Sequence, residues 1–130
     1  MSKPGIKAYG PKNPNLPFHP AVRAGDFVFV SGQVGKDEKG VMCGGTIEQE
    51  TRATIEALKR ALEAAGCTLA DVVKVTTYLE DGRDFGRYNG VFKEYFPEGR
   101  LARTTVEARA VISTRVEMDC IAYRPIEGDA

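Results

Sequence analysis

A chain of 130 residues with 42% hydrophobic side chains suits one domain with one core and is short for two. Its 18 Lys and Arg balance 18 Asp and Glu, so no net field attracts nucleic acid or an anionic membrane surface. No stretch approaches the roughly 20 apolar residues of a membrane span, and the start of the chain leads into no apolar run of signal-peptide length. We therefore expect a cytoplasmic protein that binds neither membrane nor nucleic acid.

Prolines dominate the start of the chain, where five of the seven lie within the first 20 residues. This density excludes a continuous helix or a central strand, so we expect residues 1–15 to form an extended segment. The Phe-Val-Phe-Val run at 27–30 predicts a strand buried on both faces. A short strand at 34–35, a charged turn and residues 41–42 predict a hairpin.

A capping box, in which Thr46 and Gln49 satisfy free backbone donors, predicts the start of a helix over 47–65. Gly66 is the expected end of that helix. Residues 72–79 are rich in β-forming side chains and predict the next strand.

A second helix is predicted from residue 84 or 85 to 96, with Asp84 as its cap and Pro97 as its stop. Asn89 places an amide on or beside the apolar stripe of this helix. The stripe consists of Phe85, Tyr88, Phe92 and Phe96. Two final strands are predicted over 103–110 and 115–123. In the second of them, the side chains alternate, with Val116, Met118, Cys120 and Ala122 on one face.

This order of elements favours an α+β fold with one sheet and both helices packed on one of its faces. No third predicted helix is available for the opposite face, and oligomerisation is the economical way to cover it. We expect residues 1–130 to form a single domain.

Few residues qualify for metal or nucleophilic chemistry. Cys43, Cys67 and Cys120 are widely spaced and form no CxxC pair, which argues against a disulfide framework and a zinc site. His19 is the single histidine, which excludes a His-rich metal site. It lies between stiffening prolines, which favours an exposed loop residue over a general base. Ser31 lacks the GxSxG elbow of a nucleophile.

Arg103 and Asp119 are the strongest candidates for a binding or catalytic role. At the start of a strand, the Arg103 guanidinium can hold a carboxylate through two parallel hydrogen bonds; the alternative is a surface arginine at a sheet edge. Asp119 lies in the middle of a strand, where aspartate is rare. It is therefore either paired, with Arg109 or Arg115, or a proton-transfer group.

Four segments, in order and spanning residues 16 to 124, together resemble the reactive intermediate deaminase family, also called Rid or YjgF. They are PFHPAVRAGDFVFVSGQ at 17–33, AAGCTLADVVKVT at 64–76, the predicted second helix with its stop at 85–97, and LARTTVE at 101–107 with VEMDCIA at 116–122. The resemblance implies a chorismate-mutase-like fold with one mixed sheet. It also implies a homotrimer whose sheets form a central barrel, with three ligand clefts between neighbouring subunits.

The resemblance also implies the residues of the cleft. In the family, the arginine that matches Arg103 binds the substrate carboxylate, and the backbone at the position of Thr105 offers a carbonyl to the substrate nitrogen. Ser31, Gly32 and Asn89 match further positions that line the cleft.

Two cleft positions depart from the best-known deaminases of the family. Phe18 stands where they have a tyrosine, and Asp119 stands where they have a glutamate. The phenolic hydroxyl is lost, and a water held by the shorter carboxylate shifts by more than about an ångström. Members that resemble the 3-aminoacrylate and 2-aminomuconate deaminases also lack this tyrosine and have a Pro-Phe sequence there.

The implied activity is that of a hydrolase acting on C=N bonds, which converts small enamino or imino acids to keto acids and ammonia. Arg103 anchors the substrate, and Asp119, or a water that it holds, relays the proton; no metal or organic cofactor is required. The alternatives are a pathway-specific deaminase of the aminoacrylate or aminomuconate type, and a non-catalytic trimer that binds a small carboxylate. RNA cleavage, also attached to the family name, gains no support from a chain of zero net charge.

Overall fold

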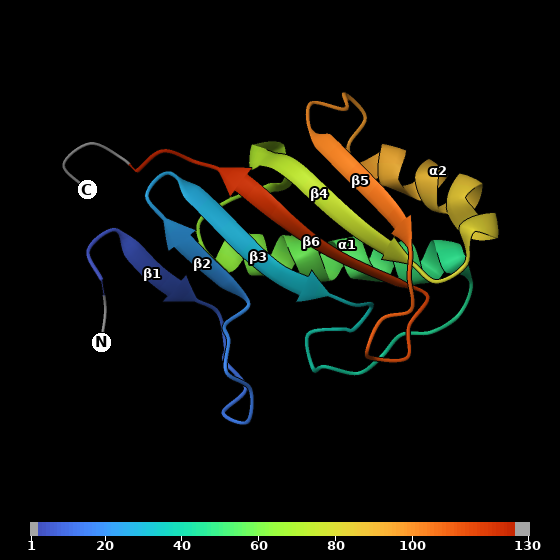
Figure 1. The fold of residues 1–130 in the computed structure, drawn as a ribbon, viewed down its shortest axis with the longest axis horizontal. Coiled ribbons are helices and arrows are strands. Elements are labelled where there is room, and N and C mark those ends of the chain that lie inside the picture. The colour runs from blue at the N-terminus through green and yellow to red at the C-terminus, as the bar shows by residue number, and fades with distance from the viewer. Residues whose placement is uncertain (1–2, 127–130) are drawn as a thin grey trace.

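A six-stranded mixed sheet and two α-helices form the fold in the computed structural model, which describes residues 3–126 (Figure 1). The strands lie in the order β1-β2-β3-β6-β4-β5. Their bounds are Ile6–Tyr9 (β1), Ala21–Ala24 (β2), Phe27–Gln33 (β3), Val72–Leu79 (β4), Ala102–Glu107 (β5) and Val116–Tyr123 (β6), and the helices are Ile47–Ala64 (α1) and Phe85–Tyr95 (α2). β4 and β5 are parallel, and the other neighbouring pairs are antiparallel. The predicted α+β fold with one mixed sheet is confirmed.

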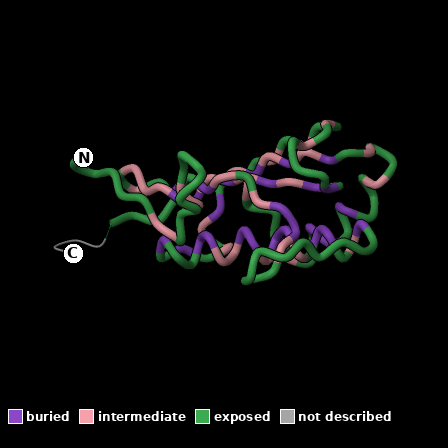
Figure 2. Tube along the Cα trace, turned by 90° about the horizontal axis from the view of Figure 1, so that it is seen from below, coloured by how far each residue is buried: buried purple, intermediate pink, exposed green. Residues whose placement is uncertain are grey.

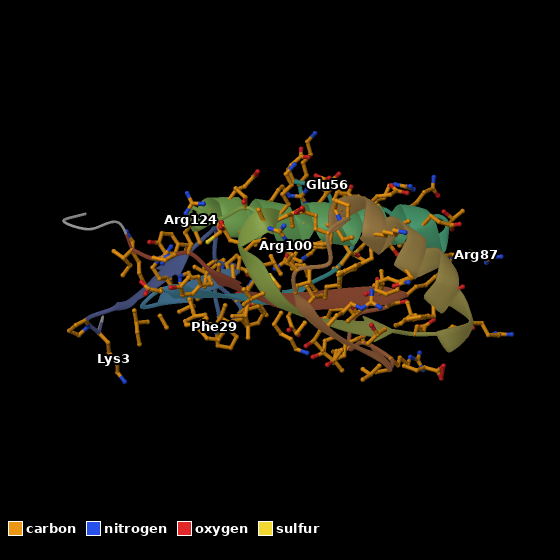
Figure 3. The ribbon with its side chains drawn as sticks, turned by 90° about the horizontal axis from the view of Figure 1, so that it is seen from above. Lys3, Phe29, Glu56, Arg87, Arg100 and Arg124 are labelled. Atoms are coloured by element: carbon orange, nitrogen blue, oxygen red, sulfur yellow. The ribbon has the colours of Figure 1, made fainter. Side chains whose placement is uncertain are left out.

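Both helices pack on the same face of the sheet, as predicted, so that Figure 2 shows one helical layer and one sheet layer with buried segments in both. Side chains of α1 meet the buried faces of β3, β4 and β6 in the core. The core includes Val28, Val30, Ile55, Leu58, Leu62, Val75, Met118 and Cys120. We call the other face of the sheet the open face. It carries Phe27, Phe29 and Tyr123, whose exposed fractions are 43%, 46% and 44%. Phe29 points away from both helices in Figure 3.

Three local predictions are confirmed in the structure. At the start of α1, the Gln49 backbone N–H donates to Thr46 Oγ1 at 3.1 Å, and the Thr46 N–H donates to Gln49 Oε1 at 2.8 Å. At its end, Gly66 follows the cap residue Ala65 with a φ of 79°, in the left-handed region that glycine adopts freely. The alternation in β6 also holds, because Val116, Met118, Cys120 and Ala122 are all buried.

The N-terminal third differs from the prediction. β1 and β2 were missed, and β1 is an edge strand within the segment expected to be merely extended. The predicted strand at 27–30 is buried on one face only, because the helices cover one face of the sheet. The predicted hairpin of 34–35 and 41–42 is reduced to a single bridge between Lys36 and Met42. The Asp37 side chain stabilises the turn instead, because the backbone N–H groups of Lys39 and Val41 donate to its Oδ1 at 2.9 and 3.0 Å.

The start of α2 is also capped differently. Asp84 makes no side-chain cap hydrogen bond, because it belongs to a 3-10 turn at Gly82–Asp84 that precedes the helix. Asp81 caps this turn instead, by accepting a hydrogen bond from the Arg83 backbone N–H at 2.9 Å. Neither helix in residues 3–126 has the length and hydrophobicity to cross a membrane.

A buried carboxylate joins α1 to the start of β6. Glu50 is 6% exposed, and its Oε2 lies 3.2 Å from Arg115 Nε. Its Oε1 accepts from the Arg115 backbone N–H at 3.2 Å and from Thr114 Oγ1 at 3.3 Å. Arg115 therefore pairs with Glu50, so the predicted pairing of Arg115 with Asp119 is wrong.

Candidate functional site

Arg103 lies on β5, on the face of the sheet that α2 covers. Its guanidinium carbon is 4.7 Å from the ring centre of Phe92, 5.4 Å from that of Tyr88 and 5.6 Å from that of Phe85. Its Nη1 donates a hydrogen bond to Asn89 Oδ1 at 2.7 Å. Cation–π attraction and this hydrogen bond together hold the guanidinium in one place.

A buried hydroxyl pair fixes α2 against the sheet. The Tyr88 and Thr77 hydroxyls are 2.6 Å apart, and both side chains are fully buried. Thr77 is on β4, the parallel neighbour of β5, and it pairs in register with Thr105. The same contact therefore sets the position of Asn89, one residue after Tyr88, relative to β5.

The charge of Arg103 is left available for a ligand. Among residues 3–126, no carboxylate lies within 4 Å of its guanidinium nitrogens, whereas five other arginines form ion pairs. A planar guanidinium with free donors matches the two oxygens of a carboxylate.

Thr105 lies two residues further along β5, at a small cavity of about 180 Å³ beside Phe85. Its Oγ1 is buried and has no hydrogen-bond partner within residues 3–126. A buried hydroxyl without a partner is unfavourable, and a ligand atom in this cavity would relieve it. We call Asn89, Arg103 and Thr105 the arginine group.

A second set of predicted residues meets at an irregularity between β3 and β6. The pairing of these strands slips between Val30 and Gln33, so that Ser31 and Gly32 both lie opposite Asp119. Such bulges re-aim side chains and backbone groups, which suits a binding site.

The loop that carries Phe18 is tied to this bulge. Ser31 Oγ donates to the His19 carbonyl at 2.7 Å, and the Ser31 backbone N–H donates to the Pro20 carbonyl at 2.9 Å. Ser31 is thus occupied as a donor to the chain, and Phe18 is exposed. We call Phe18, Ser31, Gly32 and Asp119 the aspartate group.

The sheet separates the two groups. Thr76 pairs with Asp119 on one side and with Thr104 on the other, so these three side chains share the open face. Arg103, one residue before Thr104, projects from the opposite face. β3 and β5 are also three strand spacings apart, about 14 Å. One chain therefore assembles each group but does not bring the two groups to one small ligand.

Comparison with known proteins identifies the family. The family model described as Endoribonuclease L-PSP matches residues 11–124. The chain belongs to this family, which includes the YjgF, RutC and Rid proteins. A RutC family protein of Pyrococcus abyssi is 42% identical over 126 residues, covering 95% of this chain and 99% of the relative.

Two further relatives of this Rid-family chain concern function and fold. The mouse 2-iminobutanoate/2-iminopropanoate deaminase is 36% identical over 110 residues, covering 83% of this chain and 82% of the relative. The crystal structure of a Thermotoga maritima protein described as a candidate endoribonuclease superposes with a TM-score of 0.85 at 35% identity. The superposition covers 92% of this chain and 98% of the Thermotoga maritima chain. The family predicted from sequence is confirmed.

Asp119 of this Rid-family chain has two neighbouring side chains that were not predicted from the sequence. Tyr78, on β4, donates from its hydroxyl to Asp119 Oδ2 at 3.1 Å, in place of the predicted arginine. Glu117 lies two residues before Asp119 on the same face, and its carboxylate occupies the space that a side chain at Gly32 would fill. Burial raises the pKa of Glu117, and the charge of Asp119 raises it further. The alternation of β6 is the sequence signal that would have found Glu117.

The cysteines offer no activated nucleophile near these groups. All three are free thiols, and Cys43 is exposed. Burial, with Asp119 and Cys67 adding to it, raises the pKa of Cys120 to about 12. Burial likewise raises the pKa of Cys67. Buried thiols of this kind are inert.

Proposed function

We propose that this Rid-family protein hydrolyses the enamine or imine forms of small amino-acid-derived carboxylic acids to keto acids and ammonia. The observation that carries the proposal is the Arg103 guanidinium, held by three aromatic rings and Asn89 and free of any carboxylate within residues 3–126. Such a group suits a substrate carboxylate. The deaminase name of the mouse relative supports the same reaction class.

The proposed chemistry needs positioning more than reactive groups. For 2-aminoacrylate, a proton adds to the methylene carbon and gives 2-iminopropanoate; water then adds to the C=N carbon, and ammonia leaves as pyruvate forms. One water is consumed, and no electrons pass to a cofactor, so we expect none to be required. Arg103 would orient the acid, the Thr105 carbonyl would accept from its nitrogen, and Asp119 would hold the water and relay the proton.

The proposal requires more than one copy of the chain. Because the sheet separates the arginine group from the aspartate group, we propose the homotrimer that the resemblance implies, with each cleft between two subunits. The exposed aromatic side chains of the open face support this assembly, because burying them against a neighbour is favourable. A cytoplasmic location is part of the same proposal.

Phe29→Glu is expected to prevent assembly, because it places a charge in the middle of the open face. Light scattering after size exclusion should show a monomer with far-ultraviolet circular dichroism like that of the wild type, and ammonia release should be lost. Val41→Glu changes an exposed apolar residue in the loop between β3 and α1, and it should assemble normally. A Phe29→Glu variant that still forms trimers would contradict the proposed interface.

The direct test is ammonia release from imines generated in situ, with 2-iminopropanoate, longer imino acids and 3-aminoacrylate as substrates. Hydrolysis faster than in buffer supports a deaminase, and the order of rates reports the size of acid that the cleft accepts. No acceleration with any of them would refute the deaminase proposal.

A second candidate is a trimer that binds a keto acid or another small carboxylate without turnover. Two features favour it: Phe18 has no hydroxyl, and Asp119 is one methylene shorter than the glutamate of the best-known deaminases. Calorimetric binding of a 2-keto acid that depends on Arg103, without turnover of any imine, would establish this function.

A further inference from the structure

The open face carries a tyrosine whose hydroxyl meets the proposed proton-relay carboxylate. Tyr78 pairs across the β4–β6 ladder with Glu117, which places its ring diagonally beside Asp119. Its hydroxyl donates to Asp119 Oδ2 at 3.1 Å. Among residues 3–126, the Asp119 side chain accepts this hydrogen bond through Oδ2, and its Oδ1 accepts none.

We infer that Tyr78 is a positioning residue for Asp119, which it holds with one oxygen bound and the other turned toward a substrate water. The inference rests on the proposed deaminase function. An aspartate carboxylate rotates about a short side chain, and a single fixed hydrogen bond restricts that rotation. Restricting it matters because small errors in the position of a reacting water cost rate.

The surroundings keep this phenol a hydrogen-bond donor. The hydrogen bond to Asp119 raises the pKa of Tyr78, and the charge of Asp119, burial and the charge of Glu117 raise it further. The hydroxyl is therefore protonated near neutral pH. Phe18, the aromatic member of the aspartate group, has no hydroxyl and cannot take this role.

A double-mutant cycle on turnover tests the inference. Tyr78→Phe should lower kcat for imine hydrolysis by about tenfold, the order expected for one hydrogen bond to a charged group, while KM changes by less than about twofold. In an Asp119→Asn background, Tyr78→Phe should have no further effect, because the tyrosine acts through Asp119. Tyr95→Phe is the matched control. It removes a hydroxyl that also donates to a carboxylate, Glu56 Oε2 at 2.9 Å, but in the helical layer, and it should leave kcat unchanged.

A second readout does not depend on activity. The ionisation of the Tyr78 phenol is followed by ultraviolet absorbance, as the difference between proteins with and without Tyr78→Phe in each background. This phenol should ionise at lower pH in Asp119→Asn than in wild type. Wild-type protein without imine turnover would refute the proposed function itself. Turnover that is equal in wild type and Tyr78→Phe, or losses that add in the double variant, would overturn the role of Tyr78 alone.

Discussion

Arg103→Ala is expected to lower kcat/KM for imine hydrolysis by at least about a hundredfold, because the substrate carboxylate loses two charge-assisted hydrogen bonds. Arg103→Lys keeps the charge but loses the planar fork and its stacking against Phe92. Its kcat/KM should therefore lie between those of wild type and Arg103→Ala. Ammonia release from 2-iminopropanoate, measured over a range of substrate concentrations, separates the loss into kcat and KM. Most of it should appear in KM if the contact serves ground-state binding.

The matched control is Arg87→Ala. Arg87 is an exposed arginine on α2 that points away from the sheet in Figure 3, and its removal should not change the rate. Melting curves and light scattering should show that Arg103→Ala keeps its fold and assembly. Wild-type turnover in a folded Arg103→Ala variant would remove the basis of the proposed function.

Glu50→Ala is expected to have the largest effect on stability, a loss of about 3 kcal/mol in the free energy of unfolding. The substitution leaves the Arg115 backbone N–H without its acceptor and the Arg115 side chain without its ion pair, and it opens a void between α1 and β6. The Arg115 side chain is 47% exposed, so water recovers part of the loss on its side. Urea denaturation followed by circular dichroism measures the change.

Two further variants make this test specific. Glu50→Gln keeps the side-chain volume and one acceptor oxygen. It should lower the free energy of unfolding by roughly half as much as Glu50→Ala. Glu63→Ala removes an exposed glutamate from the same helix and should stay within about 0.5 kcal/mol of the wild type. Equal stability of Glu50→Ala and Glu63→Ala would mean that the buried carboxylate does not stabilise the contact between α1 and β6.

The sequence predicted the elements whose signals are local. The capping box at Thr46 and the alternation of β6 each depend on a few consecutive residues, and both hold in the structure. β1 and β2 escaped prediction because each has only four residues, and β1 pairs with residues distant in the sequence, such as Ile6 with Ala24. Strands of four residues carry little periodicity of their own.

The site shows the same division between local and distant contacts. The aromatic stripe of α2 was visible from its spacing, but its contact with Arg103 depends on β5 lying beside α2, which topology decides. The partner of Asp119 depends on the β4–β6 register, so the sequence suggested Arg109 or Arg115 as a possible partner and missed Tyr78. Residue types could be assigned to a cleft from the resemblance, whereas the split into an arginine group and an aspartate group required the pairing of the strands.

The separation of the two groups by the sheet has a genetic consequence. In the proposed assembly, the functional unit is the junction between two chains, to which each chain contributes a different half. A chain that lacks Arg103 still supplies a sound aspartate half, and a chain that lacks Asp119 still supplies a sound arginine half. Mixed oligomers of two such inactive alleles would therefore contain some intact junctions, and the alleles would complement each other.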